Sequence, residues 1–142
     1  MSKILVVANE TVGADELLHE LRRLEDEKTS DYYVMVPARP LHERHGLMWT
    51  QEGAIEAAED RLEQTLEALR NEGLRAEGRV GDMRPLHAIN DALMDFKADM
   101  IVISTHPERR SRWLRHDLVE QAERRFGRPV IHVVSTAAAV PH

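Results

Sequence analysis

Lys3–Ala8 reads KILVVA, a continuous apolar run of the length of one β-strand. A strand that is apolar on both sides is typical of parallel sheets, which helices cover on both faces. A second run of this kind, ADMIVIS, occupies Ala98–Ser104. These two stretches predict buried strands and place the chain in the α/β class.

Three further strand-like stretches complete an alternating order of strands and helices. Asp31–Val36 is rich in β-branched and aromatic residues, Leu74–Val80 is weaker and more polar, as suits a sheet edge, and Pro129–Val134 is apolar. Helical stripes of apolar residues separate the strands, and we expect Asp82 to cap the helix that carries Pro85 in its first turn. This alternation predicts a parallel sheet with right-handed crossovers and helices on both faces.

The composition limits the class of protein and its partners. A chain of 142 residues without cysteine predicts one domain, residues 1–142, and argues for a reducing compartment. The formal charge of −6 disfavours nucleic acid as a partner, and no apolar run approaches the length of a membrane span. Since the first ten residues do not read as a signal peptide, we expect a cytoplasmic location.

Three blocks carry a resemblance to a known family: KILVVANET, GDMRPLHAINDAL, and the stretch from Ala98 to Val134. Together and in this order the blocks resemble the universal stress protein family over nearly the whole chain. The resemblance implies a Rossmann-like fold with strand order 3-2-1-4-5, two helices on each face of the sheet, and a role in the stress response. It also implies a homodimer.

The strand order of the family has a switch point between the carboxyl ends of the first and fourth strands, where ligands of such sheets bind. Carried onto this sequence, the resemblance implies a pocket at the ends of those strands and of the second strand. The candidate ligand-binding residues are Ala8, Asn9, Val36, Ser104, Thr105, His106, Arg109 and Arg112.

The glycine motif that binds ATP in this family is replaced in this sequence. At the matching positions the chain has Ser104, Pro107, Asp117 and Leu118. Pro107 has no amide hydrogen to donate, and Asp117 brings a carboxylate to the place of an anion. Asn9 replaces the usual aspartate, although its amide can still bond a ribose or a base. The sequence therefore disfavours ATP as a cofactor and names no other.

Four arginines between Arg109 and Arg115 are an alternative way to bind phosphate, since guanidinium groups pair with phosphates through two hydrogen bonds. A solvated loop, or an ionic partner for the acidic segment 52–72, explains them as well. His42 and His45 are three residues apart in a loop, which is not the spacing of a helical metal site, so we predict no metal.

No nucleophile, base and orienting group occur together in one motif, so we predict a protein that is not an enzyme. The favoured function is a regulatory or interaction role in the stress response, with room for a further protein partner. The alternative function is the binding of an adenine nucleotide or another anion through the arginines.

The last strand is predicted to form the dimer interface. It lies at a sheet edge in the implied order, and an exposed apolar edge favours pairing with another chain. Family members commonly dimerise by antiparallel pairing of this strand, which would bring His132 to its own symmetry mate. The predicted interface residues are Val130, Ile131, His132, Val133 and Val134.

Overall fold

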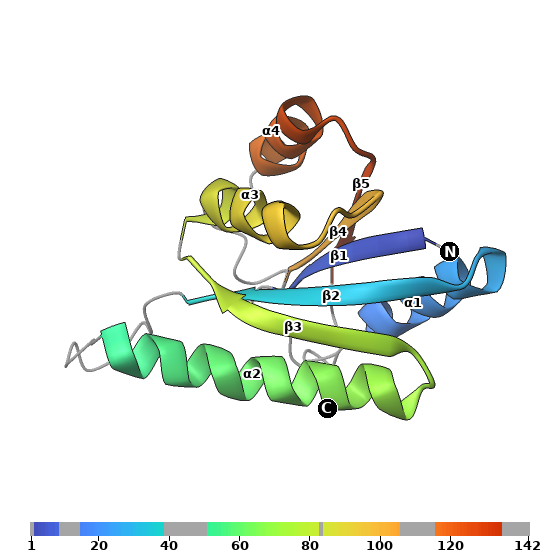
Figure 1. The fold of residues 1–142 in the computed structure, drawn as a ribbon, viewed down its shortest axis with the longest axis horizontal. Helices are drawn as coiled ribbons and strands as arrows, with labels where there is room; N and C mark the ends of the chain where they lie inside the picture. Colours follow the sequence, from blue (N-terminus) through green and yellow to red (C-terminus); the bar gives the residue numbers. More distant parts are fainter. Residues whose placement is uncertain (1, 9–14, 39–50, 83, 106–115, 135–142) are drawn as a thin grey trace.

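Five parallel strands form one sheet in the order β3-β2-β1-β4-β5, so the predicted fold class and strand order are confirmed (Figure 1). The computed structural model describes residues 2–8, 15–38, 51–82, 84–105 and 116–134. The elements are β1 (Ser2–Ala8), α1 (Asp15–Glu27), β2 (Ser30–Pro37), α2 (Gln51–Asn71), β3 (Arg75–Gly81), α3 (Pro85–Asp95), β4 (Met100–Thr105), α4 (His116–Phe126) and β5 (Val130–Val134).

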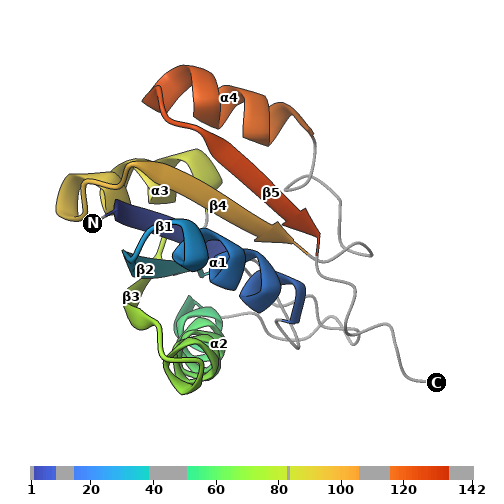
Figure 2. The same ribbon diagram turned by 90° about the vertical axis from the view of Figure 1, so that its right-hand side faces the viewer.

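The helices cover the two faces of the sheet in pairs (Figures 1 and 2). Alternate residues of β1 show why both faces need cover. Ile4 and Val6 pack in the cluster that includes the buried residues of α1 and α2, whereas Leu5 and Val7 pack in the cluster of α3. Val119 and Phe126 of α4 pack against this second cluster. The apolar run of β1 therefore reflects two hydrophobic cores on opposite sides of one strand.

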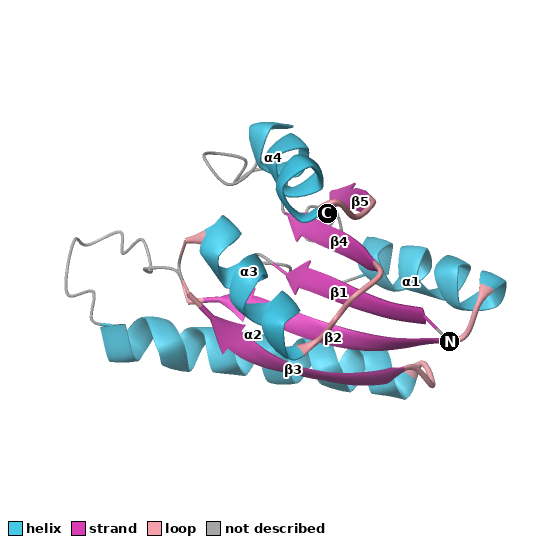
Figure 3. Ribbon diagram, turned by 45° about the horizontal axis from the view of Figure 1, so that its top comes forward, coloured by secondary structure: helices cyan, strands magenta, loops and turns pink. Residues whose placement is uncertain are grey.

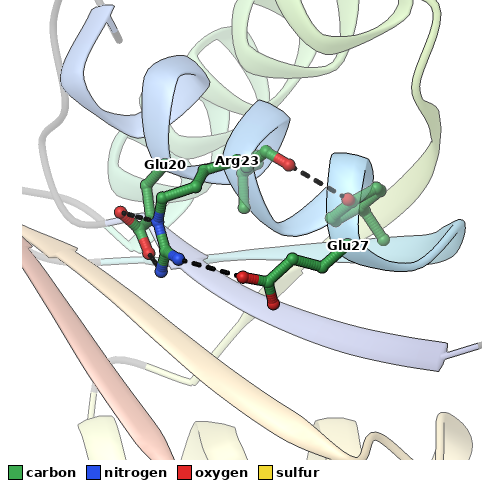
Figure 4. Close-up of polar contacts among 5 residues, drawn as sticks. Glu20, Arg23 and Glu27 are labelled. Carbon is green, nitrogen blue, oxygen red and sulfur yellow. Dashed lines mark hydrogen bonds and ion pairs between the residues drawn. The ribbon is translucent and has the colours of Figure 1, made fainter.

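Helix α1 separates its apolar and charged residues by face. Leu17, Leu21 and Leu24 recur at helical spacing and are buried against the sheet. On the outer face, Arg23 lies between Glu20 and Glu27, and its Nη1 is 3.4 Å from Glu27 Oε2 (Figure 4). Such exposed pairs contribute little to stability, so α1 is held to the sheet chiefly by its leucines.

The connection from α1 to β2 is closed by a buried hydrogen-bond group. The hydroxyl of Tyr32, which is 1% exposed, donates to Glu25 Oε1 at 2.9 Å and lies 3.3 Å from the carbonyl oxygen of Leu21. Glu25 Oε1 also accepts the backbone N–H of Ser30 at 3.1 Å. Burial, together with the hydrogen bond to Glu25, raises the pKa of Tyr32, so the phenol stays protonated and remains a donor.

The turn from α4 to β5 is held by Arg128. Its Nε donates to the carbonyl oxygen of Ala98 and its Nη1 to that of Phe126, both at 2.6 Å. Gly127 ends α4 with a φ of +64°, a left-handed conformation that favours glycine. Arg128 therefore connects the end of α4 to the residues just before β4.

The two edges of the sheet, β3 and β5, differ in character. β3 reads RAEGRVG and alternates exposed charged residues with partly buried small or apolar ones, as the sequence predicts for an edge. β5 reads VIHVV and pairs with β4 alone. The chain therefore has one polar and one apolar sheet edge.

The buried Tyr32 network gives a prediction on stability. Replacing Tyr32 by Phe removes the donor to Glu25, and hydrogen bonds to charged groups contribute about 1.5–3 kcal/mol. We expect Tyr32→Phe to lower the free energy of unfolding, measured by urea denaturation, by an amount in that range. Tyr33→Phe is the matched control, because this ring stacks on Phe96 with its centroid 5.0 Å away. The control should change stability by less than about 0.5 kcal/mol, and equal losses in both variants would contradict the prediction.

Candidate functional site

The carboxyl ends of the parallel strands lie at the same end of the sheet, where the arrowheads are drawn in Figure 3. Ala8 of β1 lies directly opposite Ser104 of β4 in the strand register. Val36 lies near the end of the neighbouring strand β2, opposite Val80 of β3. The structure thus brings Ala8 and Ser104 together at the predicted switch point, and Thr105 ends β4 there.

Three candidate residues at these strand ends are buried. Ala8, Val36 and Ser104 are 2%, 1% and 0% exposed, so their side chains are directed into the protein. The other candidate residues, Asn9, His106, Arg109 and Arg112, lie outside the described residues. Within the described ranges, no group of three or more His, Asp or Glu side chains is arranged to hold a metal ion.

Asp82 and Arg84 form a compact charged group at the same end of the sheet, directly after β3. Asp82 Oδ1 accepts the backbone N–H of Arg84 at 2.8 Å and its Nε at 3.1 Å, while Oδ2 accepts Nη2 at 3.1 Å. The N-cap residue of α3 is Arg84, without a side-chain cap, and Pro85 follows it. The expected capping of α3 by Asp82 is therefore wrong, because the carboxylate bonds the N-cap residue itself.

This group has a clear electrostatic signature. The side-chain hydrogen bonds from Arg84, and then its backbone N–H, lower the pKa of Asp82 from 3.8 to about 2. The Arg84 side chain is 66% exposed, so its guanidinium group is accessible to solvent near the carboxyl ends of the strands. Arg84 is not among the candidate residues predicted from the sequence. The only signal for it was the Asp-x-Arg spacing that follows Gly81.

The predicted interface strand divides its side chains between the two faces of the sheet. Val133 is 8% exposed and belongs to the core cluster on the α1 side, with Ile131 packed against it. Val130 packs on the opposite cluster, the α4 side. His132 is exposed, although partial burial lowers the pKa of its imidazole. Val130, Ile131 and Val133 of β5 thus pack on the two cores of the sheet.

One groove lined by described residues lies away from the switch point. It has a volume of about 620 Å³ and lies at the beginnings of β1, β2 and β3, where its lining includes Lys3, Asp31 and Arg75. These three residues occupy adjacent register positions, and Arg75 Nε is 3.2 Å from Asp31 Oδ1. This end of the sheet is opposite to the predicted ligand site.

Comparison with known proteins adds sequence and fold relationships. The model of the universal stress protein family matches residues 1–138. A universal stress protein family member from Burkholderia pseudomallei superposes with a TM-score of 0.67 and 16% identity, covering 92% of this chain and 94% of that one. A universal stress protein from Archaeoglobus fulgidus gives a TM-score of 0.63 and 20% identity, with 94% and 99% covered.

No curated protein matches the sequence significantly. Among the described helices, none has both the length and the apolar character that crossing a membrane requires.

The Asp82–Arg84 group gives a prediction that a pH titration can test. Because Arg84 supplies the largest cause of the lowered pKa of Asp82, Arg84→Met should raise that pKa from about 2 part of the way toward 3.8. The backbone N–H at position 84 remains, so the rise is incomplete. Carboxyl carbon chemical shifts in an NMR titration measure it. Arg79→Met removes an arginine that pairs with Asp95 instead, and it should leave the titration of Asp82 unchanged.

Proposed function

Because the chain belongs to the universal stress protein family, which makes it a stress-response protein, we propose that it acts as a regulatory homodimer. In this proposal the chain is not an enzyme, as is general in the family, and it holds ATP weakly or not at all. The two copies join through β5. The position of β5 at the edge of the sheet, where it pairs with β4 and with no other described strand, is the observation that carries the proposal.

Along β5 the backbone N–H and C=O groups of successive residues point alternately toward β4 and away from the sheet. Ile101 N donates to the carbonyl oxygen of Pro129, so residues 129, 131 and 133 direct their backbone groups toward β4. Residues 130, 132 and 134 consequently direct theirs to the outside of the sheet. An apolar edge strand with outward-facing backbone groups favours a second strand.

These outward groups fit a second copy of the same strand. In an antiparallel pair, residue 130 of one copy lies opposite residue 134 of the other, and His132 lies opposite its own symmetry mate. All three pairs then exchange hydrogen bonds, with Cα atoms about 5.5 Å apart. The arrangement is self-complementary about a two-fold axis, as closed homodimers require.

The weak binding of ATP in this proposal follows from the residues that replace the glycine motif. Asp117 and Leu118 lie in the first turn of α4, which begins at His116. An aspartate in the first turn of a helix brings a negative charge to the end whose dipole would otherwise attract a phosphate. Pro107, outside the described residues, lacks the amide hydrogen that a phosphate would accept.

A thermal-shift measurement with Mg-ATP tests this part of the proposal. A ligand at 100 times its dissociation constant stabilises a protein by about 2.7 kcal/mol, which corresponds to several degrees in a domain of this size. We expect about 1 mM Mg-ATP to change the melting temperature by less than about 1 °C, because the bonds that would hold the phosphates are missing.

A shift of several degrees at lower ATP concentration would overturn this expectation. The alternative function, anion binding through the arginines, would then be supported if the double variant Arg109→Ala, Arg112→Ala removed the shift. A shift that survives in the double variant would contradict both functions.

The dimer is tested by a proline on the outer edge of β5. His132→Pro removes an N–H that faces away from β4, a place where edge strands tolerate proline. We expect the wild-type chain to be a dimer at micromolar concentration in sedimentation equilibrium, and His132→Pro to be a monomer with unchanged far-ultraviolet circular dichroism.

His132→Gln is the matched control, because it changes the same side chain and keeps the backbone N–H. This variant should remain a dimer. A wild-type chain that is monomeric at neutral pH refutes the β5 interface. Val133→Lys would be a poorer test, since Val133 is buried in the core and its loss would disturb folding.

A further inference from the structure

The other edge strand, β3, has the same alternation of inward- and outward-directed backbone groups as β5. Ala38 N donates to the carbonyl oxygen of Gly81, so the odd-numbered residues of β3 direct their backbone groups toward β2. Ala76, Gly78 and Val80 therefore direct theirs outward. Three outward residues with a central Gly78 form a self-complementary edge, as the residues at 130, 132 and 134 do in β5.

The side chains of β3 would not prevent such pairing. In an antiparallel pair centred on Gly78, Glu77 of one copy lies opposite Arg79 of the other, and the reverse pair repeats this contact. Opposite charges on facing strands attract each other, although Arg79 also pairs with Asp95 of its own chain. The charged residues of β3 are therefore compatible with a second copy of the strand.

One side chain does occupy the outer edge of β3. Arg70, in the last turn of α2, donates from Nε at 3.0 Å and from Nη2 at 2.8 Å to the carbonyl oxygen of Ala76. This carbonyl is one of the outward groups. Two donors on one acceptor satisfy both of its lone pairs. The backbone of β3 is therefore closed at Ala76 by a residue six positions earlier in the chain.

A two-fold axis doubles the effect of this contact. In the antiparallel pair, Ala76 of each copy would accept from the N–H of Val80 of the other copy. With Arg70 in place, both of these hydrogen bonds are lost. Only the two copies of Gly78 can then exchange both of their backbone hydrogen bonds. The pairing would also have to bury two guanidinium groups, and burial of charge is costly.

We propose that Arg70 closes the β3 edge to a second copy of the chain, so that assembly through β5 stops at two chains. The inference rests on the proposed β5 dimer. If both edges paired, each dimer would add further dimers edge to edge, and the assembly would grow without limit. With one edge closed, the only partner that the sheet accepts is one further copy, at β5.

The acidic outer residues of α2 oppose the same pairing at longer range. Glu59, Glu63 and Glu67 are exposed on the helix that packs beside β3, and two such helices would approach each other in a β3 pair. Their repulsion is screened by salt, whereas the hydrogen bonds of Arg70 are not. The test of Arg70 is therefore sharpest at about 1 M salt, where the Debye length is about 3 Å.

Four chains distinguish the two edges by sedimentation velocity. The wild type should be a dimer, His132→Pro a monomer, the double variant Arg70→Ala, His132→Pro a dimer through β3, and Arg70→Ala alone a series of species larger than a dimer. Arg70→Lys keeps the charge and one donor nitrogen in place of two, so it should form fewer of the larger species than Arg70→Ala. The larger species should dissociate on dilution, as ordered pairing requires and irreversible aggregation does not.

Arg22→Ala is the matched control. It removes the same charge beside the same turn, where Arg22 pairs with Glu72, but it does not touch the edge of β3. It should behave as the wild type. If the double variant Arg70→Ala, His132→Pro stays monomeric, the proposed role of Arg70 is wrong. That result would not affect the proposal of a β5 dimer in the wild type. If the wild type is a dimer and His132→Pro is a dimer too, the β5 interface is wrong. The role of Arg70 is then tested by whether Arg70→Ala forms larger species than Arg22→Ala does.

Discussion

The parallel pairing of β1 with both β2 and β4 is the constraint on which the rest of the structure depends. Five consecutive residues of β1, Ile4 to Ala8, are at most 3% exposed, because strands flank them in the sheet and helices cover both faces. A strand enclosed in this way must be apolar throughout. The same enclosure places the end of β1 beside the end of β4, so the position of the candidate site follows from the central pair.

The central strand also determines where the sheet can interact. A parallel sheet with helices on both faces has only its two edge strands free for further backbone pairing. In this chain the two edges share one backbone pattern and differ in what covers it. The polar sequence of β3 would suggest that charge protects that edge, but in a pair centred on Gly78 the Glu77 of one copy would face Arg79 of the other and attract it. The hydrogen bonds of Arg70 to Ala76 are the observed cover.

Much of the fold could be predicted from the sequence, and the reason is local. Apolar runs and helical stripes report the burial of each element, so the element order follows from them. The order of the strands came from the family resemblance, because alternation alone does not determine which strands are neighbours.

The side-chain contacts could not be predicted in this way. Arg70 bonds Ala76, and Asp82 bonds Arg84, through turns whose shape the residue types do not specify. Nor does VIHVV reveal that Val133 faces the core, since its apolar residues do not alternate. The candidate residues His106, Arg109 and Arg112 remain predictions.

The hydrogen bonds of Arg128 bear on how β5 is aligned with β4. A strand that is to attract a partner must be apolar, yet a short apolar strand specifies its own alignment poorly, and a slip of one residue turns every side chain to the opposite face. Such a slip would move Val133 out of the core and His132 into it. The bonds from Arg128 to Ala98 and Phe126 tie the residue two positions before β5 to the residue two positions before β4, which disfavours such a slip. One arginine at the turn thus favours a single alignment of five residues that, in the proposed dimer, must also pair with another chain.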